Sequence, residues 1–378
     1  MKIGFDTSDL CTGREDGTTR YTAELAKRLP ELGEEKWEFF APFDFAQGKP
    51  LPINVKKILS PWPRYWTQSR LPFDLYRYPV DVMFMPIQQL PFFRPGSMKT
   101  VAVVHDLAFH VYPEQFTYKD WMLQHIFTAY ACREADAIIA VSQATAADIA
   151  KFYGRTEGVY VVHHGVDHLK FNGKKEVREK GERPYILYVG QIQPRKNIIR
   201  LVQAFVRLKE RAEFSKMRLK IAGGHGWLNS PIYRYIDQTP TREAIDVLGA
   251  VSEDMLVELY QNAEVFVLPS LYEGFGMPIV EAMAAGCPVV TSNVSCMPEI
   301  AGGAAVLVDP KSVEDIANGI LDALERREEL TEAGLQRAAG FSWDRTARET
   351  IVIIENLEKA GSHDGRRQRE DANAGQRD

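Results

Sequence analysis

Short apolar runs of strand length alternate with segments of helical pattern along almost the whole chain. In the first half, residues 2–6 and 100–104 have the composition of buried strands, and an amphipathic helix is expected over 21–29. The second half starts the pattern again, with a strand at 185–189 and a helix at 197–209. Strands that alternate with helices of this length form parallel βαβ units. The sequence therefore predicts an α/β protein with two doubly wound, Rossmann-like domains.

A change of composition separates the two series. Residues 170–184 are charged, contain few apolar side chains and end at Pro184, so they are typical of a linker. The length of 378 residues also suits two domains. We therefore expect an N-terminal domain over 1–168 and a C-terminal domain over 182–342. The polar tail 361–378 lacks aliphatic anchors and is expected to be disordered.

Composition narrows the class of protein. Hydrophobic residues make up 45% and charged residues 26% of the chain, which is ordinary for a soluble globular protein and excludes collagen, coiled coil and wholesale disorder. The net charge of -5 argues against a nucleic-acid partner, because duplex binding needs a basic face. The four cysteines form no CxxC pair and indicate no zinc site or disulfide framework. Without a signal-like or membrane-spanning run, a cytoplasmic location is expected.

The segment 266–290 is the strongest candidate for a site. A strand is followed by Glu273, by two glycines (Gly274 and Gly276) that let the backbone approach a ligand, and then by a helix. The N-terminus of a helix suits a diphosphate, and Glu281 on its first turn can accept hydrogen bonds from the vicinal hydroxyls of a ribose. Each glutamate alone also fits a capped structural helix. The whole string in this context predicts a nucleotide-diphosphate site.

Three further segments that follow strands contain candidate residues. Arg195 and Lys196 follow a strand that ends at Gly190, and adjacent cations there can neutralise a diphosphate leaving group, although a solvated basic turn is the alternative. His105 ends another strand and can donate to a substrate hydroxyl or leaving group, although a structural histidine is the ordinary alternative. Gly17 lies in a loop whose amides could hold a phosphate or sugar, and a plain loop is nearly as probable on composition.

Several familiar signatures are missing. The chain has no GxGxxG dinucleotide fingerprint, no Walker A loop and no GxSxG elbow. His163 and His164 are adjacent, but no third ligand follows at metal-binding spacing. No metal site is therefore expected.

Together these motifs match a known family. The chain resembles the glycosyltransferases of family 4, which have the GT-B fold and retain anomeric configuration. The resemblance covers residues 1 to about 359. It is most specific in EGFGMPIVE and extends to VLGAVSEDMLVELYQNAEVFVLPS and TSNVSCMPEIAGGAAVLVDP. The last stretch is most similar to bacterial mannosyltransferases of O-antigen and other surface polysaccharides. The resemblance implies two domains that face each other across a cleft, with the final helix, 343–360, packed back on the N-terminal, acceptor-binding domain.

The resemblance also implies catalytic roles. Glu273 would contact the donor sugar and face its anomeric centre. Arg195 and Lys196 would stabilise the departing diphosphate. His105 would approach the donor sugar, and Gly17 would close over the phosphates or the sugar. Such enzymes need neither a metal nor a cofactor, so the nucleotide-sugar is only a substrate.

Donor-binding roles follow in the same way. Glu281 would bind the ribose, while Val251 and Leu256 would flank the base. Glycines and backbone amides near the phosphates would come from Gly190, Gly274, Phe275, Gly276 and Met277. GDP-mannose is the first choice of donor, followed by UDP-glucose and similar compounds.

Two departures from the family pattern stand out. The first loop of the family usually carries two close glycines, whereas Gly13 and Gly17 are four positions apart here. The usual Asn-Gly-Val-Asp after the last N-terminal strand is His164-Gly165-Val166-Asp167. The first departure alters the loop that would close over the phosphates, and the second concerns a hinge.

The combined hypothesis is a retaining glycosyltransferase that moves a hexose, mannose by first choice, to a glycan or polyprenyl-linked acceptor. One alternative is a sugar-nucleotide 2-epimerase of the same fold, which would release nucleotide without an acceptor. Another is a non-catalytic nucleotide-sugar-binding module, which would tolerate the loss of Glu273.

A membrane surface is a possible further partner through residues 56–78. Aromatic side chains next to cations suit a membrane interface that carries a lipid-linked acceptor, which would place the enzyme peripherally on the inner face of the membrane. An ordinary helix pair with snorkelling arginines is an equally good reading. The residues concerned are Lys57, Trp62, Arg64, Tyr65, Trp66, Arg70, Phe73, Tyr76 and Arg77.

Overall fold

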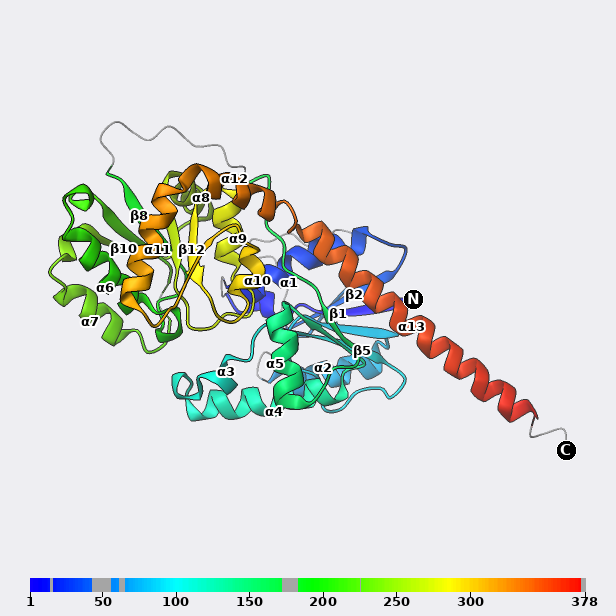
Figure 1. The fold of residues 1–378 in the computed structure, drawn as a ribbon. Coiled ribbons are helices and arrows are strands. Elements are labelled where there is room, and N and C mark those ends of the chain that lie inside the picture. The colour runs from blue at the N-terminus through cyan, green and yellow to red at the C-terminus, as the bar shows by residue number, and fades with distance from the viewer. Residues whose placement is uncertain (14–15, 43–55, 61–64, 172–182, 225, 375–378) are drawn as a thin grey trace. The chain divides into compact units, whose positions relative to one another are not determined.

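The computed structural model describes residues 1–13, 16–42, 56–60, 65–171, 183–224 and 226–374 (Figure 1). Contacts divide the chain into two units. The first unit comprises Met1–Leu107, Tyr118–His163 and Trp343–Asp378, and the second comprises Ala108–Thr117 and His164–Ser342.

The first unit is built on a seven-stranded parallel sheet in the order β3-β2-β1-β4-β5-β6-β7. From β1 the chain moves outward in one direction to β3, and from β4 it moves in the other direction to β7. The strands are β1 (Lys2–Asp6), β2 (Lys36–Ala41), β3 (Lys56–Leu59), β4 (Val82–Met85), β5 (Lys99–Val104), β6 (Ala137–Ala140) and β7 (Val159–Val161).

Most helices of the first unit lie between these strands in the chain, whereas α13 follows the second unit. Because right-handed crossovers run outward in both directions, they place the connecting helices on opposite faces of the sheet. Wholly buried strands such as β4 and β6 have the continuous apolar sequence that a covered parallel sheet requires. The helices are η1 (Ser8–Cys11), α1 (Gly17–Arg28), η2 (Leu29–Glu31), α2 (Trp66–Arg77), α4 (Tyr118–Glu134), α5 (Gln143–Tyr153) and α13 (Trp343–Ala374).

The second unit has a six-stranded parallel sheet in the order β10-β9-β8-β11-β12-β13. The chain again moves outward in two directions, so the order reverses between the neighbouring strands β8 and β11. Ligands of doubly wound sheets bind at such a switch point, beyond the carboxyl ends of the strands. The strands are β8 (Tyr185–Val189), β9 (Arg218–Ala222), β10 (Ile245–Gly249), β11 (Val265–Leu268), β12 (Val289–Ser292) and β13 (Val306–Val308).

The helices of the second unit pack on this sheet and on one another, and α6 and α9 follow the two strands of the switch point. They are α3 (Ala108–Val111), η3 (Pro113–Gln115), η4 (Pro194–Lys196), α6 (Ile198–Lys209), η5 (Ala212–Phe214), α7 (Ser230–Gln238), η6 (Arg242–Ala244), α8 (Glu253–Asn262), α9 (Met277–Ala284), α10 (Met297–Ala301), α11 (Val313–Glu325) and α12 (Arg327–Ala338).

The division between the units differs from the predicted one. It falls between His163 and His164 rather than at residue 168. Val166 forms a β-bridge with Ser342, and the His168 ring lies 2.7 Å from the carbonyl of Phe341, so both connecting segments belong to the second unit. Residues 172–182 of the predicted linker lie outside the described residues.

The last helix packs against the first unit, but it is longer than expected. Trp343 is buried beside Tyr21 of α1, and Thr346 donates to the carbonyl of His163. The helix does not end near residue 360 but continues to Ala374, so the expected disorder is not found over 361–374. This stretch contains arginine, glutamine, glutamate and alanine, which favour a helix, together with Gly361 and Gly365, which do not.

The predicted aromatic and basic segment is only partly described. It forms strand β3 and helix α2 rather than a helix pair, and Trp62 and Arg64 lie outside the described residues. Trp66 is buried and its indole donates to Asp6, whereas Phe73 and Tyr76 are exposed. Within the described residues no helix is long and apolar enough to cross a membrane.

Candidate active site

One carboxylate binds two consecutive cations at the switch point of the second unit. Glu273 follows β11, while Arg195 and Lys196 follow the neighbouring strand β8. Nη1 of Arg195 donates to Oε2 of Glu273 at 3.1 Å, and Nζ of Lys196 donates to Oε1 at 2.6 Å. All three residues are buried. The structure thus brings together two segments that the sequence picked out separately.

The backbone around the cluster explains its position. Asn197 is the C-cap of the 3-10 turn η4, and its left-handed φ of 62° redirects the chain into α6. The side-chain amide of Asn197 donates to the carbonyls of Pro269 and Pro310, which ties this turn to the loops after β11 and β13. The amide of Leu271 donates to the carbonyl of Arg195 at 2.8 Å. These bonds hold the cations against the loop that carries Glu273.

The charge on Glu273 is strongly favoured. Burial would raise the pKa of this carboxyl, but the charges of Lys196 and Arg195, with hydrogen bonds from Lys196 and Ser270, outweigh it and lower the pKa to about 2. A carboxylate with so low a pKa remains an anion and cannot act as a proton donor near neutral pH. Both of its oxygens are already engaged by cations.

Two glycines let neighbouring loops approach at this edge. Gly190 follows β8 and Gly223 follows β9, and both have positive φ values, 147° and 148°. A Cβ on Gly223 would lie 2.0 Å from the carbonyl oxygen of Gly190, so the loops can meet only without that atom. Gly190 was predicted as a donor contact, and the structure places it at the carboxyl edge of the sheet.

The predicted phosphate loop leads into α9. Gly276 is the N-cap, with a left-handed φ of 82°. The side chain of Phe275 is buried against Phe341 and the ring of His164, which leaves the loop backbone rather than this side chain for ligand contact. The first amides of a helix have no partner within the helix. Gly274 and Met277 complete the loop at the start of α9.

The second predicted glutamate lies deeper in α9 than expected. Because the helix starts at Met277, Glu281 is its fifth residue and lies just beyond the first turn. It is buried, and its Oε2 accepts a hydrogen bond of 3.1 Å from the hydroxyl of Tyr260 on α8. Leu256 is one turn before Tyr260 on the same helix, and Val251 precedes its N-cap; both are half-buried.

The remaining predicted residues, Gly17 and His105, belong to the first unit. Gly17 is the first residue of α1, after the N-cap Asp16. Nε2 of His105 lies 2.7 Å from the carbonyl of Pro86, so this nitrogen is the donor, and the imidazole packs edge-on to Tyr21 of α1. Burial lowers the pKa of His105, and the charges of Asp106 and Asp16 act in the opposite direction. His105 and the start of α1 therefore lie near each other.

Several contributors to the site were missed by sequence reasoning. Ser270 donates to Oε1 of Glu273 at 2.6 Å, and Ser295, with a left-handed φ of 57°, donates to the carbonyl of Glu273 at 2.6 Å. Tyr260 was missed as the partner of Glu281. Of these residues, Ser270 could most easily have been predicted from the sequence, because it lies between the end of β11 and Glu273.

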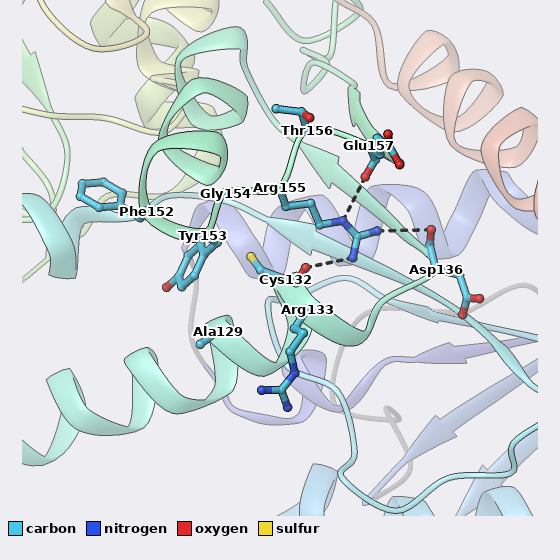
Figure 2. A pocket seen from close by; sticks show the side chains of 11 residues that line it. Ala129, Cys132, Arg133, Asp136, Phe152, Tyr153, Gly154, Arg155, Thr156 and Glu157 are labelled. Atoms are coloured by element: carbon cyan, nitrogen blue, oxygen red, sulfur yellow. Dashed lines mark hydrogen bonds between the residues drawn. The ribbon is translucent and has the colours of Figure 1, made fainter.

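A separate hollow of about 990 Å³ lies on the first unit (Figure 2). Its rim includes Asp136 and Gly158, which immediately precede β6 and β7, so it opens at the amino ends of these strands. Arg155 points into it but donates to the carbonyls of Cys132, Asp136 and Glu157 (Figure 2). The hollow contains none of the predicted site residues. Among the described residues, no group of three or more potential metal-ligating side chains was found.

Two known family models match adjacent parts of the chain, and the boundary between them lies at the start of the charged segment 170–184. Residues 16–169 match the model described as glycosyltransferase family 4, and residues 170–337 match glycosyl transferases group 1. The O-antigen chain mannosyltransferase B of Escherichia coli is 29% identical over an alignment that covers 93% of this chain and 98% of that protein.

Solved structures show the same fold. Sucrose-phosphate synthase from Thermosynechococcus elongatus superimposes with a TM-score of 0.75 at 19% identity, over 95% of this chain and 100% of that one. HepE of Anabaena, solved with UDP and glucose, has a TM-score of 0.72 at 17% identity, over 94% of this chain and 99% of that one. The two adjacent family matches, which together span residues 16–337, show that the chain belongs to the family 4 glycosyltransferases, and the solved structures show its GT-B fold.

Proposed function

We propose that this glycosyltransferase moves mannose from GDP-mannose to a glycan or polyprenyl-linked acceptor, with retention of anomeric configuration and without a metal. The observation that carries the proposal is the pair of cations, Arg195 and Lys196, held on Glu273 at the switch point of the second unit. The similarity to an O-antigen chain mannosyltransferase supports mannose as the sugar. The structure of HepE with UDP supports nucleotide-sugar binding on this fold.

In the proposed complex, each part of the donor meets a chemically suitable group. The diphosphate lies between the two cations and the amides at the start of α9, because both favour negative charge. Glu281, oriented by Tyr260, accepts hydrogen bonds from the ribose hydroxyls. Val251 and Leu256 provide apolar contact for the base.

The transfer step follows from this arrangement. The bond between the anomeric carbon and the β-phosphate oxygen breaks through an oxocarbenium-like state, and Arg195 and Lys196 stabilise the charge that develops on the phosphate. The acceptor hydroxyl attacks from the face that the phosphate leaves, and its proton passes to a phosphate oxygen. Glu273 does not serve as the nucleophile in this proposal, because both of its oxygens are held by cations and its pKa is about 2.

A screen of nucleotide-sugars tests the donor. A ligand that binds the folded state raises the melting temperature by mass action. We expect GDP-mannose to give the largest rise, and NMR of the product to show a retained α-linkage. A larger rise with UDP-glucose would identify UDP-glucose as the donor in place of GDP-mannose. A product with inverted anomeric configuration would overturn the mechanism. Release of nucleotide and an altered free sugar without any acceptor would instead favour an epimerase.

We further propose that α2 rests on an anionic membrane. Its residues Phe73 and Tyr76 are 55% and 62% exposed, and the guanidinium of Arg70 lies 4.8 Å from the centre of the Phe73 ring. Arg77 is the last residue of the helix. Exposed aromatic rings beside cations suit the headgroup region of a bilayer.

Flotation with vesicles that contain phosphatidylglycerol tests this surface. We expect the wild type to float, and the combined variant Phe73→Ser, Tyr76→Ser to lose most of the bound fraction. Leu169→Ser is the control, because Leu169 is 91% exposed but belongs to the second unit. Absence of wild-type protein from the vesicle fraction would remove the membrane from the proposal.

A further inference from the structure

A short segment from the first half of the chain is built into the second unit. Residues Ala108–Thr117 pack with that unit, although Leu107 before them and Tyr118 after them belong to the first. The segment contains the short helix α3 and the turn η3. It begins three positions after His105 in the sequence. The chain therefore crosses between units twice within a few residues, next to a predicted site residue.

Two aromatic residues attach this segment. The hydroxyl of Tyr112 donates to the carbonyl of Leu271 at 3.3 Å, and its ring centre lies 6.5 Å from that of Tyr272 in an edge-on arrangement. Phe116 packs on Trp227, with ring centres 5.9 Å apart. Tyr112 thus contacts the loop that leads to Glu273, whereas Phe116 contacts a different loop.

The loop that Tyr112 contacts is also bonded to Arg195. The amide of Leu271 donates to the Arg195 carbonyl at 2.8 Å, and Nη1 of Arg195 donates to the Tyr272 carbonyl at 2.5 Å. The same nitrogen donates to Glu273. The carbonyl that accepts from Tyr112 and the carbonyl that accepts from Arg195 therefore belong to consecutive residues, Leu271 and Tyr272. A shift of Leu271 would move the direction in which Arg195 points.

The electrostatic surroundings of the Tyr112 phenol are consistent with its role as a hydrogen-bond donor to Leu271. Burial and the neighbouring Glu114 raise the pKa of the phenol, and the positive charge of Arg195 opposes them. The phenol consequently stays protonated and can act as a donor to the Leu271 carbonyl. Arg195 also lies close enough to influence it.

We infer that Tyr112 is a positioning residue for glycosyl transfer, which holds the Leu271–Glu273 loop so that Arg195 faces the departing diphosphate. The inference rests on the proposed function of Arg195. It predicts that Tyr112 acts on the rate of transfer through Arg195, rather than on donor affinity. It also gives Tyr112 a part in the donor site, although this residue comes from the acceptor-binding half of the sequence.

The test is a double-mutant cycle with Tyr112→Phe and Arg195→Lys. Tyr112→Phe removes one hydroxyl and keeps the ring, so we expect kcat to fall about three- to tenfold, as for the loss of one hydrogen bond, with KM for the donor within about twofold. In the Arg195→Lys background the same substitution should change kcat by less than about twofold, because coupled residues are not additive. Phe116→Leu should leave kcat near the wild-type value.

Three results would each overturn the inference. They are a kcat of Tyr112→Phe within twofold of wild type, an equal fall in both backgrounds, and a rise in donor KM that accounts for the whole effect. Thermal unfolding of each variant separates misfolding from mispositioning, since Tyr112→Phe should melt close to wild type. Failure of the wild type to transfer any sugar would contradict the proposed function instead, and is recognised before the variants are compared.

Discussion

Nζ of Lys196 lies 2.6 Å from Oε1 of Glu273, although the two residues are 77 positions apart in the chain. Arg195 holds the other carboxylate oxygen at 3.1 Å. The arrangement comes from topology, because β8 and β11 are neighbours at the point where the strand order reverses. Glu273 therefore holds the two cations in one place before a donor arrives. Preorganised charge of this kind stabilises a developing anion without reorganisation during the reaction.

Removal of the lysine charge should affect the reaction more than the fold. Lys196→Ala leaves Glu273 paired with Arg195, so we expect the protein to fold while kcat falls by about 10²–10³-fold, as for loss of one preorganised electrostatic contact. Steady-state kinetics with the donor identified above measures the fall. The control is Lys216→Ala, which removes an exposed lysine of the same unit. Turnover of Lys196→Ala equal to that of the control would remove Lys196 from the mechanism.

The depressed pKa of Glu273 makes the stability depend on pH in a defined direction. Its pKa is about 2 in the folded protein, against an ordinary value of 4.5. A carboxyl group of this kind stabilises the fold above its unfolded pKa, and the contribution is lost as the pH falls from about 4.5 towards 2. Over this window the wild type should lose roughly 3 kcal/mol more unfolding free energy than Glu273→Gln.

Chemical denaturation at a series of pH values measures this difference. Glu258→Gln is the control, because Glu258 is an exposed glutamate on α8 of the same unit, and this variant should follow the wild type. Parallel curves for wild type and Glu273→Gln would show that the ion pairs with Lys196 and Arg195 do not lower the pKa of Glu273.

The hydroxyl of Tyr260 should matter for donor binding. It donates to Glu281 within the buried interior, so Tyr260→Phe leaves the carboxylate without this orienting bond. We expect KM for the donor to rise about three- to tenfold with kcat nearly unchanged, because the ribose contact is made equally in the ground and transition states. Tyr185→Phe is the matched control, since it removes a buried hydroxyl that bonds the same helix at the Leu259 carbonyl. A fall in kcat at constant KM would contradict the ribose role.

The sequence predicted the fold well because the pattern that defines it is local. Alternating strands and helices require only short stretches of chain, and the return of the pattern at 185 revealed the second sheet. The local conformation at Gly276 was also predictable, since a glycine before a proline-containing first turn is a strong helix-start signal. The position of Glu281 was misjudged by part of a turn, because helix starts vary by a residue or two and this one begins at Met277.

What the sequence did not reveal depends on contacts between distant segments. Residues 108–117 have a composition similar to that of their neighbours, and nothing in their pattern indicates that they pack with the second unit. A single serine or tyrosine, such as Ser270 or Tyr260, has no periodicity and becomes visible only when its partner is close. The pairing of Arg195 with Glu273 was likewise not predicted, since each had been assigned separately to phosphate or sugar.

The close approach of the loops at Gly223 and Gly190 should be intolerant of a single methyl group. The Cβ of Gly223→Ala would lie 2.0 Å from a backbone oxygen, and no rotamer can relieve contact with a backbone atom. The loops after β8 and β9 would have to separate, which we expect to cost roughly 3 kcal/mol of unfolding free energy and to lower kcat/KM for the donor, because Arg195 and Lys196 lie in the first of these loops.

Gly249→Ala is the matched control for this prediction. Gly249 ends the neighbouring strand β10 and also has a positive φ, 70°, but a Cβ there would meet no atom within 4 Å. Only the backbone strain of a left-handed alanine remains, about 1 kcal/mol, and kcat/KM should stay near the wild-type value. Urea denaturation and donor kinetics of the two variants make the comparison. Equal losses at Gly223 and Gly249 would mean that positive φ, rather than the loop contact, accounts for the glycine at position 223.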